Sequence, residues 1–264
     1  MRICSIASGS SGNCIYVGNK NNHILIDAGI SRKRIVDGLA SIGVAPEMLD
    51  AIFVTHEHSD HISGIPMMVK MFGVPIFATG GTLDALCRKD RQDILEKKRL
   101  FQLYAEEPVA VGDFHITPFA MSHDAAEPVC YTVECGGKKF GMATDLGKFD
   151  SCTVERLAGS DMLLLEANHD ISMLEAGKYP YSLKCRILGG QGHLSNEASG
   201  QLLCKLIHGK LRHVFLAHLS KENNYPQLAY EAVKCQLWEE KGMTDLPFAM
   251  EVANRDRPSD LVSL

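Results

Sequence analysis

The chain alternates between short apolar runs and amphipathic stretches. The apolar runs are rich in β-branched residues and end at turn-forming residues, a pattern typical of β-strands. The stretches between them repeat apolar residues at helical spacing, as Ile30, Ile35, Leu39 and Ile42 do before Gly43, a plausible helix stop. This alternation predicts a layered α/β protein.

The same pattern gives approximate element positions. We expect strands at residues 3–7, 14–17, 23–26, 51–55, 74–78, 109–118, 129–135, 139–143, 162–166 and 214–217. We expect helices at residues 30–42, 62–72, 82–100, 151–158, 196–208 and 222–238. The segment 169–193 fits neither pattern and is predicted to be a long irregular stretch, either a functional loop or a plain surface loop.

Size and composition narrow the class of protein. The 264 residues include no repeat, low-complexity stretch or Pro/Ser linker, so a single domain over residues 1–264 is expected. Hydrophobic residues make up 45% and charged residues 22%, as in ordinary globular proteins. The net charge of -5 excludes a global basic field that would attract nucleic acid, but it leaves room for a local basic groove.

The nine cysteines are odd in number and form no C-x-x-C pair. Most have apolar neighbours, so buried free thiols in a reducing compartment are expected. The sequence shows no signal peptide and no apolar run of transmembrane length. These features predict a cytoplasmic protein that does not contact a membrane.

One short run carries most of the candidate chemistry. It ends in the pattern H-x-H-x-D-H, formed by His56, His58, Asp60 and His61 directly after an apolar, strand-like segment. The i, i+2 spacing of the first two histidines places them on one face of an extended segment, while Asp60 and His61 point elsewhere. Imidazole and carboxylate groups suit zinc, manganese and iron. The run therefore predicts two adjacent metals, against the alternative of a histidine-rich polar loop.

Three further ligand-type residues also follow predicted strands. His123 comes after the strand that ends near Phe119, Asp145 after residues 139–143, and His218 after residues 214–217. A dinuclear metal site needs such additional ligands at strand ends, where short loops converge.

This ordered set of residues resembles the metallo-β-lactamase fold superfamily, and the resemblance covers at least residues 1–240. It implies a four-layer αββα sandwich and two divalent metal ions, zinc or manganese. It also implies that one metal is bound by His56, His58 and His123, and the other by Asp60, His61 and His218. Asp145 would bridge the two metals, and Asp27 would support a ligand from behind.

Departures within the superfamily narrow the expected activity. The commonest class B lactamases have a cysteine where this chain has Asp145, and the aspartate favours a hydrolase of esters or phosphodiesters. Only 72 residues lie between Asp145 and His218, too few for the inserted domain of the β-CASP nucleases.

Two segments resemble motifs of the tRNA 3′-processing endonucleases: Leu165-Glu166-Ala167-Asn168-His169 and the run that begins Gly192-His193-Leu194-Ser195. The resemblance implies that His193 assists departure of the leaving group and that Glu166 orients His193. The alternatives are a helix-flanking histidine, with Ser195 or Asn196 as the cap, and a strand-end surface carboxylate.

Over the whole chain, the sequence resembles the YycJ/WalJ family of compact bacterial metallo-β-lactamase-fold proteins. The motifs that carry this resemblance are C-S-I-A-S-G-S-S-G-N-C, E-A-N-H-D, Y-P-Y-S-L-K, G-H-L-S-N and H-L-S-K-E-N-N. It implies a dinuclear phosphodiesterase of the 5′-to-3′ DNA exonuclease type. Its catalytic residues would be Asp60, which orients the nucleophile, with His193 and Glu166.

Other readings of the chain stay open. The same metals could serve a hydrolase of a small ester, thioester, lactone or cyclic phosphodiester, and a non-catalytic protein could use the same scaffold. A nucleic acid substrate is expected, DNA rather than RNA, and the sequence identifies no protein partner.

Two groups that contain basic residues could have either a binding role or an ordinary structural role. Tyr179, Tyr181, Lys184 and Arg186 either contact nucleic acid or pack as a loop on the domain. The mixed charges of residues 88–91 and 97–99 favour a solvated helix face.

Overall fold

The computed structural model describes residues 1–90, 95 and 99–264, which form two compact units. Unit 1 contains residues 1–120, 125–137 and 254–264, and unit 2 contains residues 121–124 and 138–253. The single domain expected over residues 1–264 stays a prediction.

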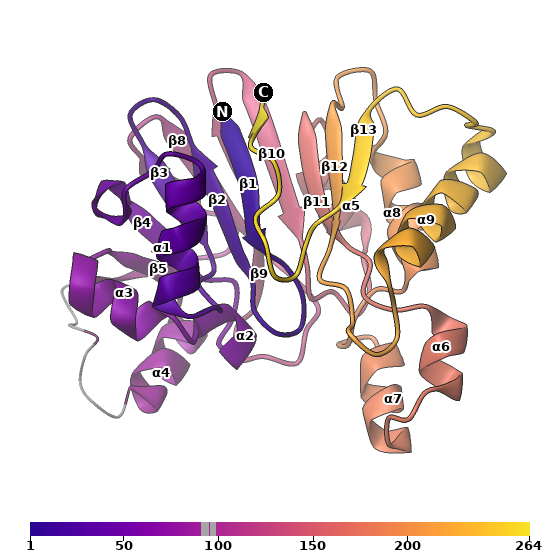
Figure 1. The fold of residues 1–264 in the computed structure, drawn as a ribbon, viewed down its shortest axis with the longest axis horizontal. Coiled ribbons are helices and arrows are strands. Elements are labelled where there is room, and N and C mark those ends of the chain that lie inside the picture. The colour runs from indigo at the N-terminus through magenta and orange to yellow at the C-terminus, as the bar shows by residue number, and fades with distance from the viewer. Residues whose placement is uncertain (91–94, 96–98) are drawn as a thin grey trace. The chain divides into compact units, whose positions relative to one another are not determined.

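Unit 1 contains a mixed sheet of seven strands in the order β14-β1-β2-β3-β4-β5-β6 (Figure 1). Its strands are β1 (Arg2–Ala7), β2 (Cys14–Gly18), β3 (His23–Ile26), β4 (Ala51–Phe53), β5 (Ile76–Thr79), β6 (Leu100–Leu103) and β14 (Val262–Ser263). The pairs from β14 to β3 are antiparallel, and those from β3 to β6 are parallel. Every residue of β2, β3 and β4 is buried, which explains why these strands read as continuous apolar runs.

Three antiparallel strands complete the β-structure of unit 1: β7 (Val109–Val111), β8 (Phe114–Ala120) and β9 (Val129–Cys135). The helices of this unit are α1 (Arg32–Ser41), α2 (Ser59–Ile62), α3 (Ile65–Phe72), α4 (Gly80–Lys89) and the short 3-10 helix η1 (Pro46–Met48). Helix α1 packs on the seven-stranded sheet through Ile35 and Leu39. A Cβ atom on Gly38 would lie 2.4 Å from Cγ2 of Ile6, so this close approach of helix and strand requires glycine.

Unit 2 is built on four parallel strands in the order β13-β12-β11-β10. They are β10 (Lys138–Ala143), β11 (Met162–Glu166), β12 (His213–Ala217) and β13 (Ala249–Val252). In the observed register Ala143 pairs with Leu165, and Glu166 pairs with Ala217. The carboxyl ends of three neighbouring strands therefore lie at one level of the sheet, the edge at which open α/β sheets usually bind ligands.

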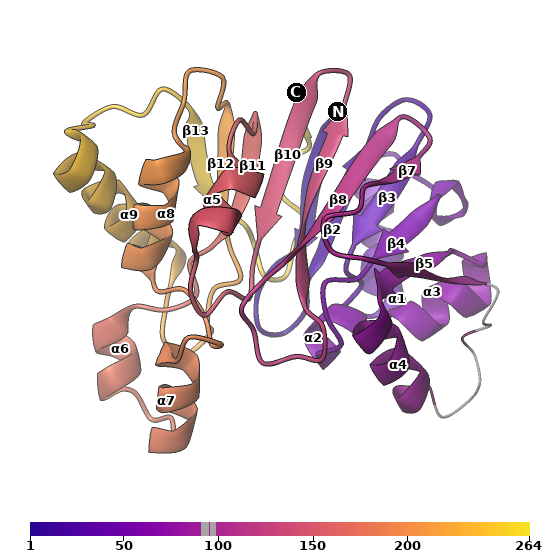
Figure 2. The ribbon, with the colours of Figure 1, turned by 180° about the vertical axis from the view of Figure 1, so that it is seen from behind.

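The helices of unit 2 are α5 (Ser151–Leu157), α6 (Ile171–Ala176), α7 (Tyr181–Leu188), α8 (Asn196–Leu206) and α9 (Pro226–Lys241). Helices α8 and α9 pack closely, since a Cβ atom on Gly200 would lie 2.6 Å from Cβ of Gln236. Figures 1 and 2 both show α6 and α7 beyond the carboxyl ends of the parallel strands, in the connection between β11 and α8.

The predicted alternation of strands and helices is confirmed, but several details were wrong. Segment 169–193 is not irregular, because it contains α6 and α7. Helix α6 begins at an Asp170 side chain that caps Met173 N–H, and α7 follows Pro180, so each is a short helix with its own start signal. The glycines and prolines of this segment, which are typical of loops, hid both helices from the sequence pattern.

Two expected boundaries also differ. The helix expected over residues 82–100 ends at Lys89, and Leu100 begins β6; residues 91–94 and 96–98, which include part of the predicted charged face, lie outside the described residues. The strand expected over residues 109–118 is two strands, separated by a turn at Gly112 with φ of 55°. The structure also contains η1, α2, β6, β13 and β14, which the pattern did not predict.

All nine cysteines are free, as predicted, but only Cys4, Cys14, Cys130 and Cys204 are buried. The expectation that most thiols are buried was therefore wrong. Among the residues that the structure describes, no helix combines the length and the apolar character needed to cross a bilayer.

The central position of β11 in the sheet of unit 2 predicts a large cost for Leu164→Ala. Leu164 is fully buried, so the substitution leaves a cavity and should lower the free energy of unfolding by about 2–5 kcal/mol. The matched control is Leu188→Ala on α7, where the side chain is 45% exposed and a change within about 0.5 kcal/mol is expected. Urea unfolding of both variants measures the difference, and equal midpoints would contradict the assignment of Leu164 to the core.

Candidate metal and catalytic site

In unit 1, a buried carboxylate joins the ends of two parallel strands. Asp27 follows β3 directly, with a left-handed φ of 61°, and its N–H donates to the carbonyl of Phe53 at the end of β4 (2.7 Å). The Asp27 carboxylate accepts hydrogen bonds from Thr55 N–H (2.8 Å) and the Thr55 hydroxyl (2.9 Å). It also lies 2.7 Å from Nδ1 of His61. Asp27 thus links the strand end to the segment that carries the H-x-H-x-D-H pattern.

This contact determines which nitrogen of His61 is available to a metal. In this contact Nδ1–H of His61 donates to the Asp27 carboxylate, so Nε2 carries the lone pair. In the structure Nε2 lies 3.1 Å from the side-chain amide of Asn13 and 3.6 Å from Oδ2 of Asp60. A histidine held this way by a carboxylate is typical of metal ligands, as the resemblance implied for Asp27.

The other residues of the pattern lie beside His61. The ring centroids of His56 and His61 are 4.1 Å apart, and those of His56 and His58 are 4.6 Å apart. Helix α2 begins immediately after His58 and carries Asp60 and His61. Because of this short helix, Asp60 and His61 point in a different direction from His56 and His58, which lie on the extended segment before it, as the spacing predicted.

In unit 2, the candidate residues follow β10 and β12 in the same way. Asp145 and His218 have left-handed backbone conformations, with φ of 62° and 56°. Such conformations cost about 1–3 kcal/mol in a non-glycine residue, and they persist where surrounding contacts determine them. They turn both side chains inward: Nε2 of His218 lies 3.5 Å from Oδ1 of Asp145, and Nε2 of His123 lies 3.9 Å from the same oxygen.

Glu166 holds this group together. It is fully buried, and its Oε2 accepts the backbone N–H groups of Leu146 (2.8 Å) and Leu194 (3.1 Å). Its Oε1 lies 2.8 Å from Nδ1 of His193 and 3.0 Å from Nδ1 of His218. Burial acts to raise the pKa of this carboxyl, but the two histidines outweigh burial and hold the pKa well below its usual range. Glu166 is therefore ionised and leaves Nε2 of both rings directed away from it.

The donor atoms in both units fit divalent metal ions. Asp145, Glu166, His193 and His218 each offer a ligand atom, and these atoms lie within 4.8 Å of one another. His123 has Nδ1 3.2 Å from the carbonyl of Gly192, which requires a proton there and puts the lone pair on Nε2. Neutral imidazoles oriented by carboxylates or carbonyls, beside further carboxylates, form a donor set that suits zinc or manganese.

The structure thus brings together every predicted site residue within its own unit. Unit 1 brings together His56, His58, Asp60 and His61, of which His61 contacts Asp27, and unit 2 brings together His123, Asp145, Glu166, His193 and His218. The surface-carboxylate alternative for Glu166 was wrong, because Glu166 is fully buried. Ser195 caps α8, as the alternative for His193 expected, and His193 in addition contacts Glu166 (2.8 Å) and Asp145 (3.7 Å).

Sequence reasoning missed several supporting residues. The Thr55 hydroxyl lies 2.9 Å from Nδ1 of His56, and the Asn168 amide donates to the carbonyl of His218 (2.8 Å). Thr55 precedes the H-x-H pattern, and Asn168 lies within the E-A-N-H-D motif, so their positions were a signal. His169 is buried, and its ring nitrogens have no hydrogen-bond partner in the described part of the chain.

The chain is similar to known proteins over most of its length. A family model described as a beta-lactamase superfamily domain matches residues 22–218. The chain is 37% identical over 234 residues to exodeoxyribonuclease WalJ of Streptococcus pneumoniae, covering 88% of this chain and 86% of the relative. It is 35% identical over 237 residues to exodeoxyribonuclease YycJ of Bacillus anthracis, covering 90% and 89%.

The solved structures show the fold. The metallo-beta-lactamase fold protein YhfI of Bacillus subtilis superposes with a TM-score of 0.70 over 98% of both chains, at 15% identity. The predicted fold class, an α/β sandwich of the metallo-β-lactamase type, is confirmed.

Buried His169 generates a prediction about stability and pH. Burial lowers the pKa of His169 to about 4, below the ordinary value of about 6.5. Between these values the unfolded chain binds a proton that the folded chain does not, so this residue makes the folded state less stable as pH falls from about 6.5 to 4. His169→Gln should remove up to about 3 kcal/mol of that loss over this range.

The measurement is the difference in free energy of unfolding between wild type and variant at several pH values. Other titrating groups are common to both proteins and cancel in the difference. His115→Gln, at an exposed position, is the matched control and should leave the pH dependence unchanged. A constant difference for His169→Gln from pH 7 to pH 4 would contradict the prediction.

Proposed function

The chain belongs to the YycJ/WalJ family of the metallo-β-lactamase superfamily, and on that premise we propose that it is a metal-dependent exonuclease that degrades DNA from the 5′ end. The observation that carries the proposal is the buried Glu166 that holds both His193 and His218. The pairing supports the proposal because His193 can then serve as the proton donor and His218 as a metal ligand, in a chain related over nearly its whole length to two exodeoxyribonucleases.

The proposed site binds two divalent metal ions. In this proposal His56, His58 and His123 would hold one ion, Asp60, His61 and His218 would hold the other, and Asp145 would be shared by both. Such ions would lower the pKa of an attacking water and stabilise charge on the phosphoryl oxygens. The orientation of His61 by Asp27 and of His218 by Glu166 supports these assignments.

The protein side chains have separate tasks in this proposal. Asp60, besides being a ligand, orients the nucleophile. Glu166 accepts Nδ1–H of His193 and keeps Nε2 of the ring turned away from the carboxylate. A proton on Nε2 can then pass to the sugar oxygen as that oxygen departs. A phosphodiester needs this proton because an alkoxide is a poor leaving group.

We favour DNA over RNA because both full-length relatives are named as exodeoxyribonucleases. A small activated ester would not need the proton donor that Glu166 positions, so the alternative of a small-ester hydrolase is not favoured. The cytoplasm, where free thiols persist and DNA is accessible, is the proposed location.

A substrate panel with the metal-loaded protein tests the proposed function. We expect linear DNA to be degraded faster than RNA of the same sequence, with little activity on lactones or thioesters. A strand labelled at its 5′ end should release labelled mononucleotide at once, whereas a strand labelled at its 3′ end should shorten gradually. Hydrolysis of small esters alone, without any cleavage of nucleic acid, would overturn the proposal.

Asp145→Asn serves as the matched inactive variant in this panel. Asparagine tolerates the left-handed backbone at this position, so the variant should fold, but it lacks the charge needed to contact two metals. We expect a loss of turnover of at least about 10²-fold and fewer than two metal ions per chain, measured by elemental analysis. Full metal content with near-normal turnover would show that Asp145 does not have the bridging role.

His193→Ala tests the proton donor. The variant should keep its metal content and lose about 10² to 10⁴ in turnover on DNA, the usual range for general acid catalysis. On a nitrophenyl phosphodiester, whose leaving group needs no proton, the loss should be much smaller. Equal losses on both substrates would instead indicate that His193 positions the substrate or supports the metals.

A further inference from the structure

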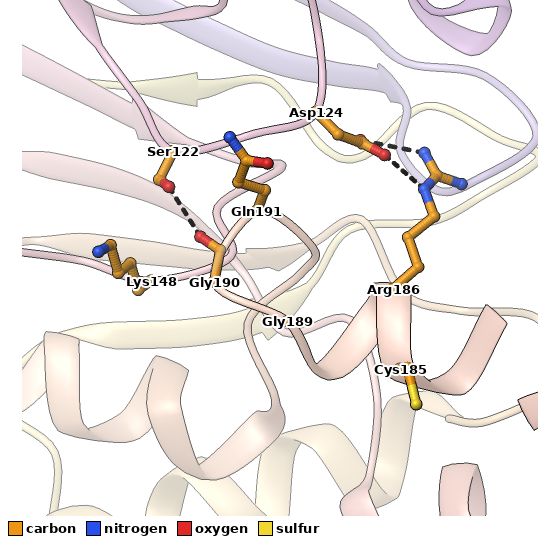
Figure 3. A pocket seen from close by; sticks show the side chains of 8 residues that line it. All are labelled: Ser122, Asp124, Lys148, Cys185, Arg186, Gly189, Gly190 and Gln191. Atoms are coloured by element: carbon orange, nitrogen blue, oxygen red, sulfur yellow. Dashed lines mark hydrogen bonds and ion pairs between the residues drawn. The ribbon is translucent and has the colours of Figure 1, made fainter. Parts of the chain in front are cut away.

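A pocket of about 460 Å³ opens in unit 2 (Figure 3). It is lined by Ser122, Asp124, Lys148, Cys185, Arg186, Gly189, Gly190 and Gln191. Its size is within the range of small-ligand sites. None of the proposed ligands or catalytic residues lines it, so its role is separate from that of the metal site.

Residues that line the pocket are nevertheless sequence neighbours of candidate site residues at three places. Ser122 and Asp124 flank His123, Lys148 lies three residues after Asp145, and Gln191 lies two residues before His193. A ligand group bound in the pocket is therefore close to a group bound by His123, Asp145 or His193, as neighbouring units of one polymeric substrate would be.

The two cations of the pocket differ in what they contact. The guanidinium of Arg186 forms a two-pronged ion pair with Asp124, with one N···O distance of 3.0 Å, which neutralises its charge (Figure 3). By contrast, the ammonium group of Lys148 is exposed and makes no hydrogen bond or ion pair within the described part of the chain. Lys148 therefore gives the pocket its uncompensated positive charge.

The backbone of the Gly189–Gln191 turn adds further donors. The N–H of Gly192 donates to the carbonyl of Gly189, but the N–H groups of Gly190 and Gln191 have no acceptor among the described residues. The turn is held in place, because Ser122 Oγ donates to the Gly190 carbonyl (2.7 Å) and a Cβ atom on Gly147 would lie 2.2 Å from the Gly190 carbonyl carbon. Successive free N–H groups beside a lysine are a typical anion-binding arrangement.

An aromatic ring lies on the same helix as one wall of the pocket. Tyr181 is 82% exposed and precedes Cys185 by one helical turn, so both lie on one face of α7. Exposed aromatic rings beside basic groups can stack nucleic acid bases.

We propose that this pocket binds a phosphate group of the nucleic acid strand, through Lys148 and the N–H groups of Gly190 and Gln191, with the adjoining base stacked on Tyr181. The proposal rests on the proposed nuclease function and assigns part of its substrate-binding surface. The phosphate is either the terminal monoester of the strand or an internal diester.

The test is binding of a fluorescent oligodeoxynucleotide with phosphorothioate linkages, which keep the backbone charge and resist cleavage, to the metal-loaded protein. Lys148→Ala should weaken binding about tenfold. It should also reduce the slope of log affinity against log salt concentration by roughly 0.7, the contribution of about one phosphate contact in a single strand. Lys148→Arg should retain most of the affinity. Lys205→Ala, an exposed lysine on α8, is the matched control and should bind as wild type does.

A second variant tests the pocket without removing charge. A Cβ atom on Gly190 would lie near only Cδ of Lys148 (3.8 Å), so Gly190→Ala should fold normally and weaken binding by narrowing the pocket. Oligonucleotides with a 5′-phosphate or a 5′-hydroxyl separate the two sources of phosphate. If Lys148→Ala affects only the first, the pocket binds the terminal monoester; if it affects both equally, the pocket binds an internal diester.

Failure of this inference is distinguishable from failure of the proposed function. If the wild-type protein degrades DNA and Lys148→Ala binds the strand with unchanged affinity and salt dependence, the pocket assignment is wrong and the proposed nuclease function stands. A wild-type protein that binds the strand through Lys148 and cleaves none would overturn the nuclease and support the pocket.

Discussion

The buried carboxylate of Glu166 is the contact on which the candidate site of unit 2 depends. One side chain at the end of β11 accepts hydrogen bonds from the segment after β10, from the segment before α8 and from the residue after β12. A buried charge is costly unless it is paired and fully hydrogen-bonded. Its four donors meet that requirement, and in doing so they position Asp145, His193 and His218.

Unit 1 uses the same arrangement with a shorter side chain. Asp27 at the end of β3 is buried, accepts hydrogen bonds from Thr55 and orients His61. In both units parallel strands end at one level, and a residue with a left-handed backbone turns its side chain back over the sheet edge. The sheet register thus provides the coarse placement, and the buried carboxylate provides the orientation of each imidazole.

Much of the candidate site could be predicted from local sequence motifs. The H-x-H-x-D-H run, the strand-end positions of Asp145 and His218, and the pairing of Glu166 with His193 could all be predicted, since each depends on residues near one another in the chain or on motifs with a known spacing. Helices α6 and α7 were not predicted. They have six and eight residues and lie in a segment whose glycines and prolines are typical of a loop.

By itself, the sequence determined the strand and helix alternation, the fold class and the identity of the candidate ligands. It could not determine which basic side chain near the site is available to bind a ligand. Arg186 and Lys184 belong to the group with Tyr179 and Tyr181 that the sequence singled out, whereas Lys148 does not belong to such a group. Tertiary structure decided this, because Arg186 is neutralised by Asp124, 62 residues away, and Lys184 donates to the Glu175 carbonyl. Whether a charge remains available depends on what lies beside it in space, and that is set by folding.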